Sequence, residues 1–229
     1  DNQLREPQQA EKFRAAARQH GVAVPSMAMS GFFAQSFLTR DNYQDLLKDC
    51  FQTMKLFGSK VAFLPLGGSG KDWQQEGCTA YQQMVSRLRT AGEMAKQEGI
   101  TIGIRTGMDA KFDKKLLKKV GSSQIKVYYN FQDAADHHRD ICKELRKLGA
   151  QRIVQIHASN TDSVNLQEDS EINLPKIRKT LDKMKWSGWL VVERSRDVKR
   201  VRDVKYNFGR NIAYLKQVFQ EVTVSGNNW

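Results

Sequence analysis

The stretch QRIVQIHASN, residues 151–160, carries the pattern from which the fold of this chain is predicted. Its apolar run ends on a histidine and then breaks into Ala158-Ser159-Asn160, which is typical of a β-strand whose carboxyl end presents His157. The same design recurs further along the chain, where WLVVE at 189–193 ends on Glu193. Two strands that end in ligand-type side chains predict one mouth lined by both residues.

The rest of the chain repeats this design as a regular alternation of helices and strands. Strands are predicted at 22–30, 60–66, 100–106, 124–130, 152–158 and 188–194. Helices are predicted at 4–20, 41–57, 79–97, 111–120, 133–148, 174–185 and 204–221. Nearly continuous apolar strands between helices are typical of a covered parallel sheet, and no proline- or serine-rich linker divides the chain. We therefore predict an α/β fold with a single domain over residues 1–229.

Six predicted strands suit two architectures. A (β/α)8 TIM barrel would lack its first two strands in this sequence, which begins on a predicted helix, so the domain would be N-terminally incomplete. An open doubly wound sheet needs no further strands, but the sequence has no glycine-rich first turn of the dinucleotide-binding type. We therefore expect the barrel.

The composition narrows the range of partners. The 229 residues include 37 Lys and Arg against 25 Asp and Glu, which gives a net charge of +12. The basic residues are spread over all the predicted helices, as on solvated faces; the alternative is an anionic partner, either an acidic or phosphorylated small molecule or a nucleic acid. Because they do not gather on one face, we expect no tight nucleic-acid binding. No apolar run reaches the length of a membrane span, about 18 residues, so no membrane partner is expected.

Cysteine usage and the N-terminus leave the compartment open. Cys50, Cys78 and Cys142 have no paired spacing, which argues against a metal knuckle and a disulfide-stapled fold. The polar N-terminal residues have none of the features of a secretion signal. A cytoplasmic and a periplasmic location both fit, and the oligomeric state is not determined by the sequence.

One glycine-rich loop invites a nucleotide-binding interpretation. Residues 66–71 read LGGSGK, but Pro65 stands where a phosphate-binding loop needs its first glycine, and Asp72 replaces the Ser or Thr that would hold magnesium. A loop at the carboxyl end of a strand that contacts substrate through backbone N–H groups is the better interpretation.

Polar side chains stand at the ends of four predicted strands. Arg105, Asn130, His157 and Glu193 occupy matching positions, which in a barrel is the catalytic face. Because side chains alternate along a strand, Gln155 shares the face of His157 and Tyr128 shares the face of Asn130. We therefore expect these strand ends to form one site at equivalent heights.

These segments resemble the xylose isomerase-like TIM barrels, the sugar phosphate isomerase/epimerase group. The resemblance is carried by IGIR at 102–105, VYYN at 127–130, QIH at 155–157, INLP at 172–175 and WSGWLVVERSR at 186–196. It extends over essentially the whole chain. It implies a barrel whose third to eighth strands are the six predicted here.

The resemblance implies a sugar isomerase or epimerase that moves a proton next to a carbonyl. In that family a Glu, an Asp, a His and a second Glu hold a divalent cation such as Mn²⁺, Mg²⁺ or Zn²⁺. His157 and Glu193 match, whereas Arg105 stands in place of the first Glu and Asn130 in place of the Asp. An amide oxygen can ligate a hard cation, but a guanidinium cannot bind a metal or serve as a base.

The predicted site follows from these matches. Glu193 and His157 are the predicted catalytic residues, and Asn130, His157 and Glu193 are the predicted metal ligands. Substrate-binding roles are predicted for Arg105, Gln155, Tyr128 and Arg196. Arg105 would hold a carboxylate or phosphate by two hydrogen bonds, so a sugar or anionic sugar derivative is the expected partner.

Three other functions are alternatives to a sugar isomerase or epimerase. A non-catalytic carbohydrate-binding barrel that lost its metal, and a hydrolase or lyase that uses Glu193 with His157, both stay open. A repair endonuclease with a three-metal site is disfavoured, because the chain has only four histidines.

Overall fold

The computed structural model describes residues 3–67, 73–160 and 162–220, and it has the predicted α/β character. Six parallel strands form one sheet in the order β1-β2-β3-β4-β5-β6 among the described residues. Their bounds are β1 Ser26–Ala28, β2 Val61–Pro65, β3 Thr101–Arg105, β4 Ile125–Asn130, β5 Ile153–Asn160 and β6 Leu190–Arg194. Strand order therefore follows chain order, as in a βα repeat, and the predicted fold class is confirmed.

Helices separate these strands. The α-helices are α1 Pro7–Gln19, α2 Gly31–Ala34, α3 Tyr43–Phe57, α4 Thr79–Gln97, α5 Ala110–Val120, α6 Phe131–Ala135, α7 Ile141–Leu148, α8 Leu174–Lys183 and α9 Val204–Phe219. Short 3-10 turns are η1 Gln3–Arg5, η2 Ala150–Arg152, η3 Leu166–Glu168 and η4 Val198–Arg200. In the described part of the chain, no helix combines the length and apolarity needed to cross a membrane.

The chain contacts cluster in two compact units. The first unit holds Asp1–Tyr128 with Arg152–Val154, and the second holds Tyr129–Gln151 with Gln155–Trp229. Strands β4 and β5 each begin in the first unit and continue into the second. The prediction of a single domain over residues 1–229 stays a prediction.

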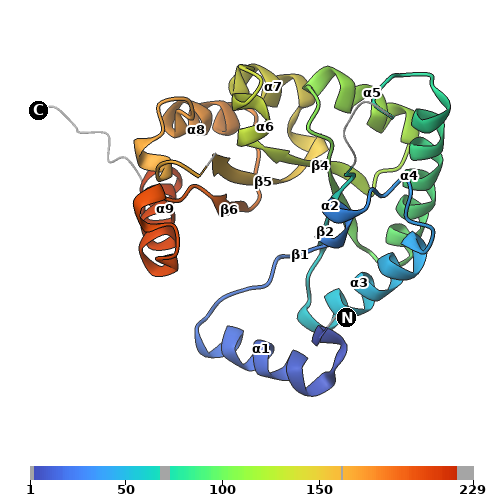
Figure 1. Ribbon diagram of the computed structural model, residues 1–229, viewed down its shortest axis with the longest axis horizontal. Helices are drawn as coiled ribbons and strands as arrows, with labels where there is room; N and C mark the ends of the chain where they lie inside the picture. The colour runs from blue at the N-terminus through green and yellow to red at the C-terminus, as the bar shows by residue number, and fades with distance from the viewer. Residues whose placement is uncertain (1–2, 68–72, 161, 221–229) are drawn as a thin grey trace, which may run out of the picture. The chain divides into compact units, whose positions relative to one another are not determined.

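The first unit is a layer of parallel strands with an apolar core. Ala62, Phe63 and Leu64 of β2 are all buried, and β2 pairs in register with β1 and with β3. Gly103 of β3 must be a glycine, because a Cβ there would lie 2.8 Å from Val154 and 2.9 Å from the Tyr128 ring. Helix α1 contacts α3 and, in Figure 1, is set apart from the strands of its unit.

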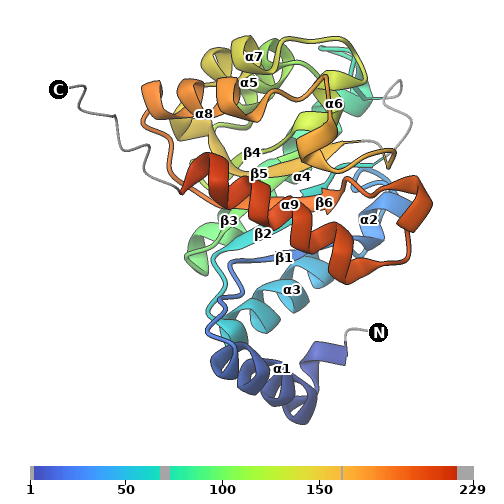
Figure 2. The same cartoon turned by 90° about the vertical axis from the view of Figure 1, so that its left-hand side faces the viewer.

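In the second unit the helices pack against one another, and α9 also contacts β6. Helix α7 contacts α8, and α8 contacts α9; Figure 2 shows α7 beside α8. Helix α8 begins where the Asn173 side chain accepts a hydrogen bond from the Lys176 N–H, and Pro175 stands in its first turn. Leu145, Leu174 and Leu181 are buried in the core of this unit.

Several predicted boundaries are corrected. The predicted helix at 133–148 is two helices, α6 and α7, separated by a turn in which His138 has a φ of 51°. The predicted strand at 22–30 is reduced to three residues, and a short helix, α2, follows it. Helix α3 is preceded by Asn42, whose side chain makes no cap hydrogen bond. The predicted end of this helix at residue 57 is confirmed, and Gly58 follows it with a left-handed φ of 68°.

The glycine-rich loop gives no further information. Residues 68–72 lie outside the described residues, so the interpretation of LGGSGK as a substrate-contacting loop stays a prediction.

Candidate active site

The candidate site lies in the second unit, where β4, β5 and β6 end. Asn130 is the last residue of β4, and His157 and Ser159 lie on one face of β5 because they are two residues apart in a strand. Glu193 stands near the end of β6. Parallel strands put their carboxyl ends at one edge, so side chains that are distant in the sequence meet there.

Glu193 is the centre of this cluster. Its Oε2 lies 3.4 Å from His157 Nδ1 and 3.5 Å from Asn130 Nδ2. The side chain of His157 is 8% exposed, whereas that of Glu193 is 34% exposed. Both distances are at the outer limit of a hydrogen bond, which is usual for catalytic groups before substrate is present. A carboxylate reached by solvent beside a buried imidazole is suited to proton transfer.

The pairing register of β5 and β6 shows that His157 and Glu193 do not lie at equivalent heights, contrary to the prediction. Glu193 pairs in register with Ser159, whereas His157 pairs with Val191. His157 therefore lies two residues deeper along its strand than Glu193 does along β6. The Glu193 side chain still comes within 3.4 Å of His157 Nδ1, because a glutamate side chain extends beyond its own backbone position.

The Asn130 side chain contacts Glu193 and also accepts hydrogen bonds that join β4 to β5 and cap α6. Its Oδ1 accepts a hydrogen bond of 2.8 Å from Ser159 Oγ and one of 3.3 Å from the Asp133 N–H, which caps α6. Its Nδ2 faces the Glu193 carboxylate. The amide oxygen, the atom that a cation would need, is thus already committed to two donors.

This donor set does not fit a resident divalent cation. Among the described residues, no group of three or more His, Cys, Asp or Glu side chains could hold a metal ion. Of the predicted ligands Asn130, His157 and Glu193, Asn130 turns a hydrogen-bond donor toward the carboxylate. The predicted metal site therefore has only an imidazole and one carboxylate ready to bind a cation.

The turn after Glu193 has an unusual backbone. Arg194 and Ser195 have φ values of 57° and 61°, in the left-handed region that glycine favours. For residues with a Cβ this conformation costs roughly 1–2 kcal/mol each, so surrounding contacts must hold it. Ser195 is buried, and its Oγ accepts a 3.0 Å hydrogen bond from the Asn160 N–H.

Buried asparagines surround this turn. The Ser195 carbonyl accepts hydrogen bonds from Asn165 Nδ2 at 3.1 Å and from Asn211 Nδ2 at 2.8 Å. Asn207 Oδ1 accepts from Asn165 Nδ2 at 3.0 Å and from the Asp197 N–H at 2.9 Å. Asn165, Asn207 and Asn211 are each at most 1% exposed. The turn is therefore held from inside by amides that no local pattern links to it.

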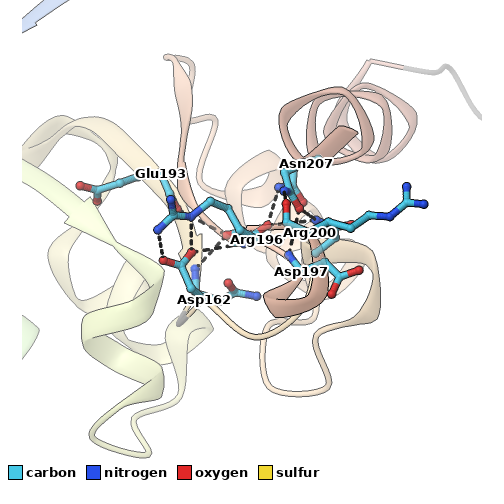
Figure 3. Close-up of polar contacts among 10 residues, drawn as sticks. Asp162, Glu193, Arg196, Asp197, Arg200 and Asn207 are labelled. Carbon is cyan, nitrogen blue, oxygen red and sulfur yellow. Dashed lines mark hydrogen bonds and ion pairs between the residues drawn. The ribbon is translucent and has the colours of Figure 1, made fainter. Parts of the chain in front are cut away.

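Arg196, a predicted substrate-binding residue, is engaged by Asp162. The guanidinium makes a two-point ion pair with this carboxylate, with Nε 3.0 Å from Oδ1. In Figure 3, Arg196 reaches back to Asp162, whereas the Glu193 carboxylate points away from the pair. The hydrogen bond from Arg196, with its charge, holds the pKa of Asp162 below its ordinary value. A substrate role for Arg196 would require this ion pair to open.

The other predicted binding residues are dispersed. Gln155 lies on the face of β5 that carries His157, but it is only 1% exposed. Tyr128 belongs to the first unit, where its ring packs against Phe63 with centroids 4.7 Å apart. Arg105 also belongs to the first unit, at the end of β3, and its carbonyl accepts a hydrogen bond from the Leu66 N–H. The structure thus brings together Asn130, His157 and Glu193, and the roles of the remaining residues stay predictions.

Sequence reasoning missed several residues of this region. Ser159 could have been found, because it shares the face of His157 within the stretch at 151–160. Asp162 and the three asparagines carry no signal in their spacing. The side-chain hydrogen-bond partners of Asp162, Asn165 and Asn211 are at least 16 residues away in the chain, as for Asn211 and Ser195.

The first unit has a separate feature, an apolar groove. It has a volume of about 990 Å³ and is lined by α1, β1 and α3, including Phe13, Met27 and Cys50. Burial, with a smaller contribution from the charge of Asp49, raises the pKa of the Cys50 thiol to about 12. The lining carboxylate of this groove, Asp49, is ion-paired with Arg5, whereas the Glu193 carboxylate lies beside the His157 imidazole, so the groove is not the candidate active site.

Comparisons with known proteins give the family. A family model described as "Xylose isomerase-like TIM barrel" matches residues 2–218. No curated protein gives a significant match to the sequence. Solved structures are similar in fold at low identity. A xylose isomerase domain protein from Planctomyces limnophilus has a TM-score of 0.72 at 14% identity, over 95% of this chain and 86% of that one.

Two epimerase structures are similar to about the same degree. The 3-keto-D-glucoside 4-epimerase of E. coli has a TM-score of 0.71 at 10% identity, over 90% of this chain and 84% of that one. The D-psicose 3-epimerase of Clostridium cellulolyticum H10 has a TM-score of 0.71 at 14% identity, over 91% of this chain and 81% of that one. At these identities, the likeness concerns the fold.

Proposed function

We propose, since the chain belongs to the xylose isomerase-like TIM barrel family, that it is a sugar isomerase or epimerase in which Glu193 moves a proton next to a carbonyl. The observation that carries this proposal is the solvent-reached Glu193 carboxylate 3.4 Å from the buried His157 imidazole. The epimerases among the structures of similar fold support the reaction class.

The chemistry can be written with these two side chains. Glu193, as the base, takes the proton from the carbon next to the substrate carbonyl. The electrons of that C–H bond form a carbon–carbon double bond, and the carbonyl oxygen takes up the negative charge. The His157 imidazole, by donating a hydrogen bond to that oxygen, stabilises the enediolate.

The carbon to which the proton returns, and the face from which it returns, decide between isomerisation and epimerisation. Epimerisation at one carbon ordinarily needs a second base on the opposite face of the substrate. The described cluster of Asn130, His157, Ser159 and Glu193 contains one carboxylate. Glu193 returning the proton to the neighbouring carbon on the same face, while the hydroxyl proton passes from the second enediolate oxygen to the first, would interconvert an aldose and a ketose. Of the two reactions, the aldose–ketose isomerisation is therefore the better supported.

The preferred substrate is an anionic sugar. Arg105 replaces a carboxylate of the family pattern, and a guanidinium suits a carboxylate or phosphate. The net charge of +12 favours the approach of anions as well. We propose that a sugar phosphate or a sugar acid is bound in preference to a neutral sugar.

Proton exchange with solvent tests the proposal directly. Neutral sugars, sugar phosphates and sugar acids are incubated with the protein in D2O, and loss of the proton next to the carbonyl is followed by NMR. Glu193→Gln should slow the exchange by roughly 10²–10⁴-fold, because an amide cannot accept the proton.

The matched control is Glu171→Gln, which removes an exposed carboxylate in the same unit and should leave the rate unchanged. Binding of a sugar without any exchange would replace the enzyme proposal by the non-catalytic carbohydrate-binding barrel. Cleavage of the substrate into two fragments would indicate a hydrolase or lyase.

A further inference from the structure

The turn that follows Glu193 is held in a conformation that its own residues do not favour. Arg194 and Ser195 are consecutive residues with a Cβ and a left-handed φ, at 57° and 61°. Left to themselves, such residues return to negative φ. Strained backbone of this kind concentrates at functional sites, where the surroundings over-determine it. Something beyond the turn must therefore hold it.

Two amide side chains supply that constraint. Asn165 Nδ2 and Asn211 Nδ2 both donate to the Ser195 carbonyl, at 3.1 and 2.8 Å. Asn211 is itself fixed, because its Oδ1 accepts a 2.8 Å hydrogen bond from the Leu166 N–H. Both side chains are at most 1% exposed, so water cannot readily replace either donor. We call Asn165 and Asn211 the carbonyl clamp.

The clamped turn is joined directly to the candidate base. Ser195 Oγ lies 3.4 Å from the Glu193 carbonyl and accepts a hydrogen bond from the Asn160 N–H of β5. Ser195 is thus bonded at its carbonyl to the clamp and at its hydroxyl to both strands of the site. A change of φ at residues 194 and 195 would rotate the end of β6, which carries Glu193.

We propose that Asn165 and Asn211 are positioning residues, which aim the Glu193 carboxylate at His157 by holding the Arg194–Ser195 turn in its left-handed conformation. This inference rests on the proposed function, in which Glu193 is the base. The polar network around Asn207 supports the same turn from the next residues, since Asn207 Oδ1 accepts from the Asp197 N–H.

The test combines a spectroscopic and a kinetic measurement on the full chain. Asn211→Leu removes one clamp donor, and Asn165→Ala is a milder second variant in case Asn211→Leu does not fold. The ¹⁵N shifts of the His157 imidazole report its contact with Glu193, and the His157→Gln spectrum assigns them among the four histidines. The shifts should move toward those of Glu193→Gln.

Catalysis should respond in a specific way. A small displacement of the base should lower kcat by about tenfold to a hundredfold and leave KM nearly unchanged, because binding contacts remain. Asn173→Ala is the matched control, since it removes a helix cap of α8 in the same unit. It should lower the Tm without changing the His157 shifts or kcat.

A rescue variant separates positioning from simple destabilisation. Arg194→Gly makes the left-handed φ free of steric cost, so it should restore part of the lost kcat and of the His157 shifts in the Asn211→Leu background. A variant that only destabilised the fold would regain Tm without these signals.

The outcomes distinguish this inference from the proposed function. If the wild-type chain exchanges no sugar proton but the His157 shifts move in Asn211→Leu, the proposed reaction is wrong and the clamp stands. If wild type is active and both clamp variants fold and keep their shifts and kcat, the clamp inference is wrong and the function stands.

Discussion

The two units are built from the same alternation of helices and strands, but the central strand of the first and the region after β6 in the second bury different kinds of side chain. In the first unit, the central strand β2 buries Ala62, Phe63 and Leu64. In the second, the region after β6 buries Ser195, Asn207 and Asn211, each with hydrogen-bond partners. An apolar core tolerates small shifts of its members, whereas a buried amide must keep its partners. The buried polar side chains therefore follow the strand that carries Glu193, the side chain whose orientation matters for proton transfer.

The largest expected contrast concerns the Cys50 thiol in the apolar groove of the first unit. Its pKa of about 12 leaves on the order of a thousandfold less reactive thiolate than an ordinary cysteine has at pH 8. Alkylation by iodoacetamide, followed by mass spectrometry of the peptides, should therefore modify Cys78 long before Cys50. Equal rates at the two positions would show that the groove is not the apolar environment described here.

A truncation in the apolar core should produce the largest loss of stability. Leu64 is completely buried in β2, so Leu64→Ala should lower the free energy of unfolding by about 2–5 kcal/mol. Urea denaturation measures the change. Leu56→Ala removes the same atoms at a position that is 41% exposed and should cost well under half as much. Similar losses at the two positions would contradict the packing described for the first unit.

A truncation in the polar interior should have a smaller but clear effect. Asn207 Nδ2 donates to the carbonyls of Arg200 and Asp203, at 2.7 and 3.0 Å, and its Oδ1 accepts from Asp197 and Asn165. Asn207→Leu should cost about 1–3 kcal/mol, because buried polar groups lose their partners. Urea denaturation again gives the value, and exposed Asn42→Ala is the control. No difference between these two variants would show that the asparagine network contributes nothing to stability.

The smallest expected effect is at the Arg196–Asp162 ion pair. Arg196 lowers the pKa of Asp162, so the pair stabilises the folded state above the unfolded-state pKa of roughly 4, and that stabilisation is lost as the pH falls through the folded-state pKa. Arg196→Gln should lower stability only slightly near pH 7, because solvent screens an exposed ion pair, and the difference from wild type should vanish in acid.

Thermal unfolding between pH 7 and pH 2 measures this difference. Arg202→Gln, which removes an exposed guanidinium nearby, should follow the wild-type curve across the range. A difference from wild type in Arg196→Gln that grew as the pH fell would contradict the assigned direction of the Asp162 pKa.

The sequence by itself determined the features that depend on neighbouring residues. The alternation of apolar strands with helices, the end of α3 at Gly58 and the placement of His157 and Glu193 near strand ends all follow from short-range periodicity and capping. The break between α6 and α7 was missed, although its signal is local: the chain turns at His138, and Asp140 caps α7 by accepting a hydrogen bond from the Lys143 N–H.

Only the tertiary structure decided how the site is arranged. Periodicity places Glu193 near a strand end, but strand pairing puts it opposite Ser159. Nothing local reveals that the Asn130 oxygen is used by Ser159 and Asp133, or that Asn165 and Asn211 hold the Ser195 carbonyl. These contacts join residues far apart in the chain, and an amide has the same local preferences whichever distant partner it finds. Pairing register and buried hydrogen bonds are therefore properties of the folded chain.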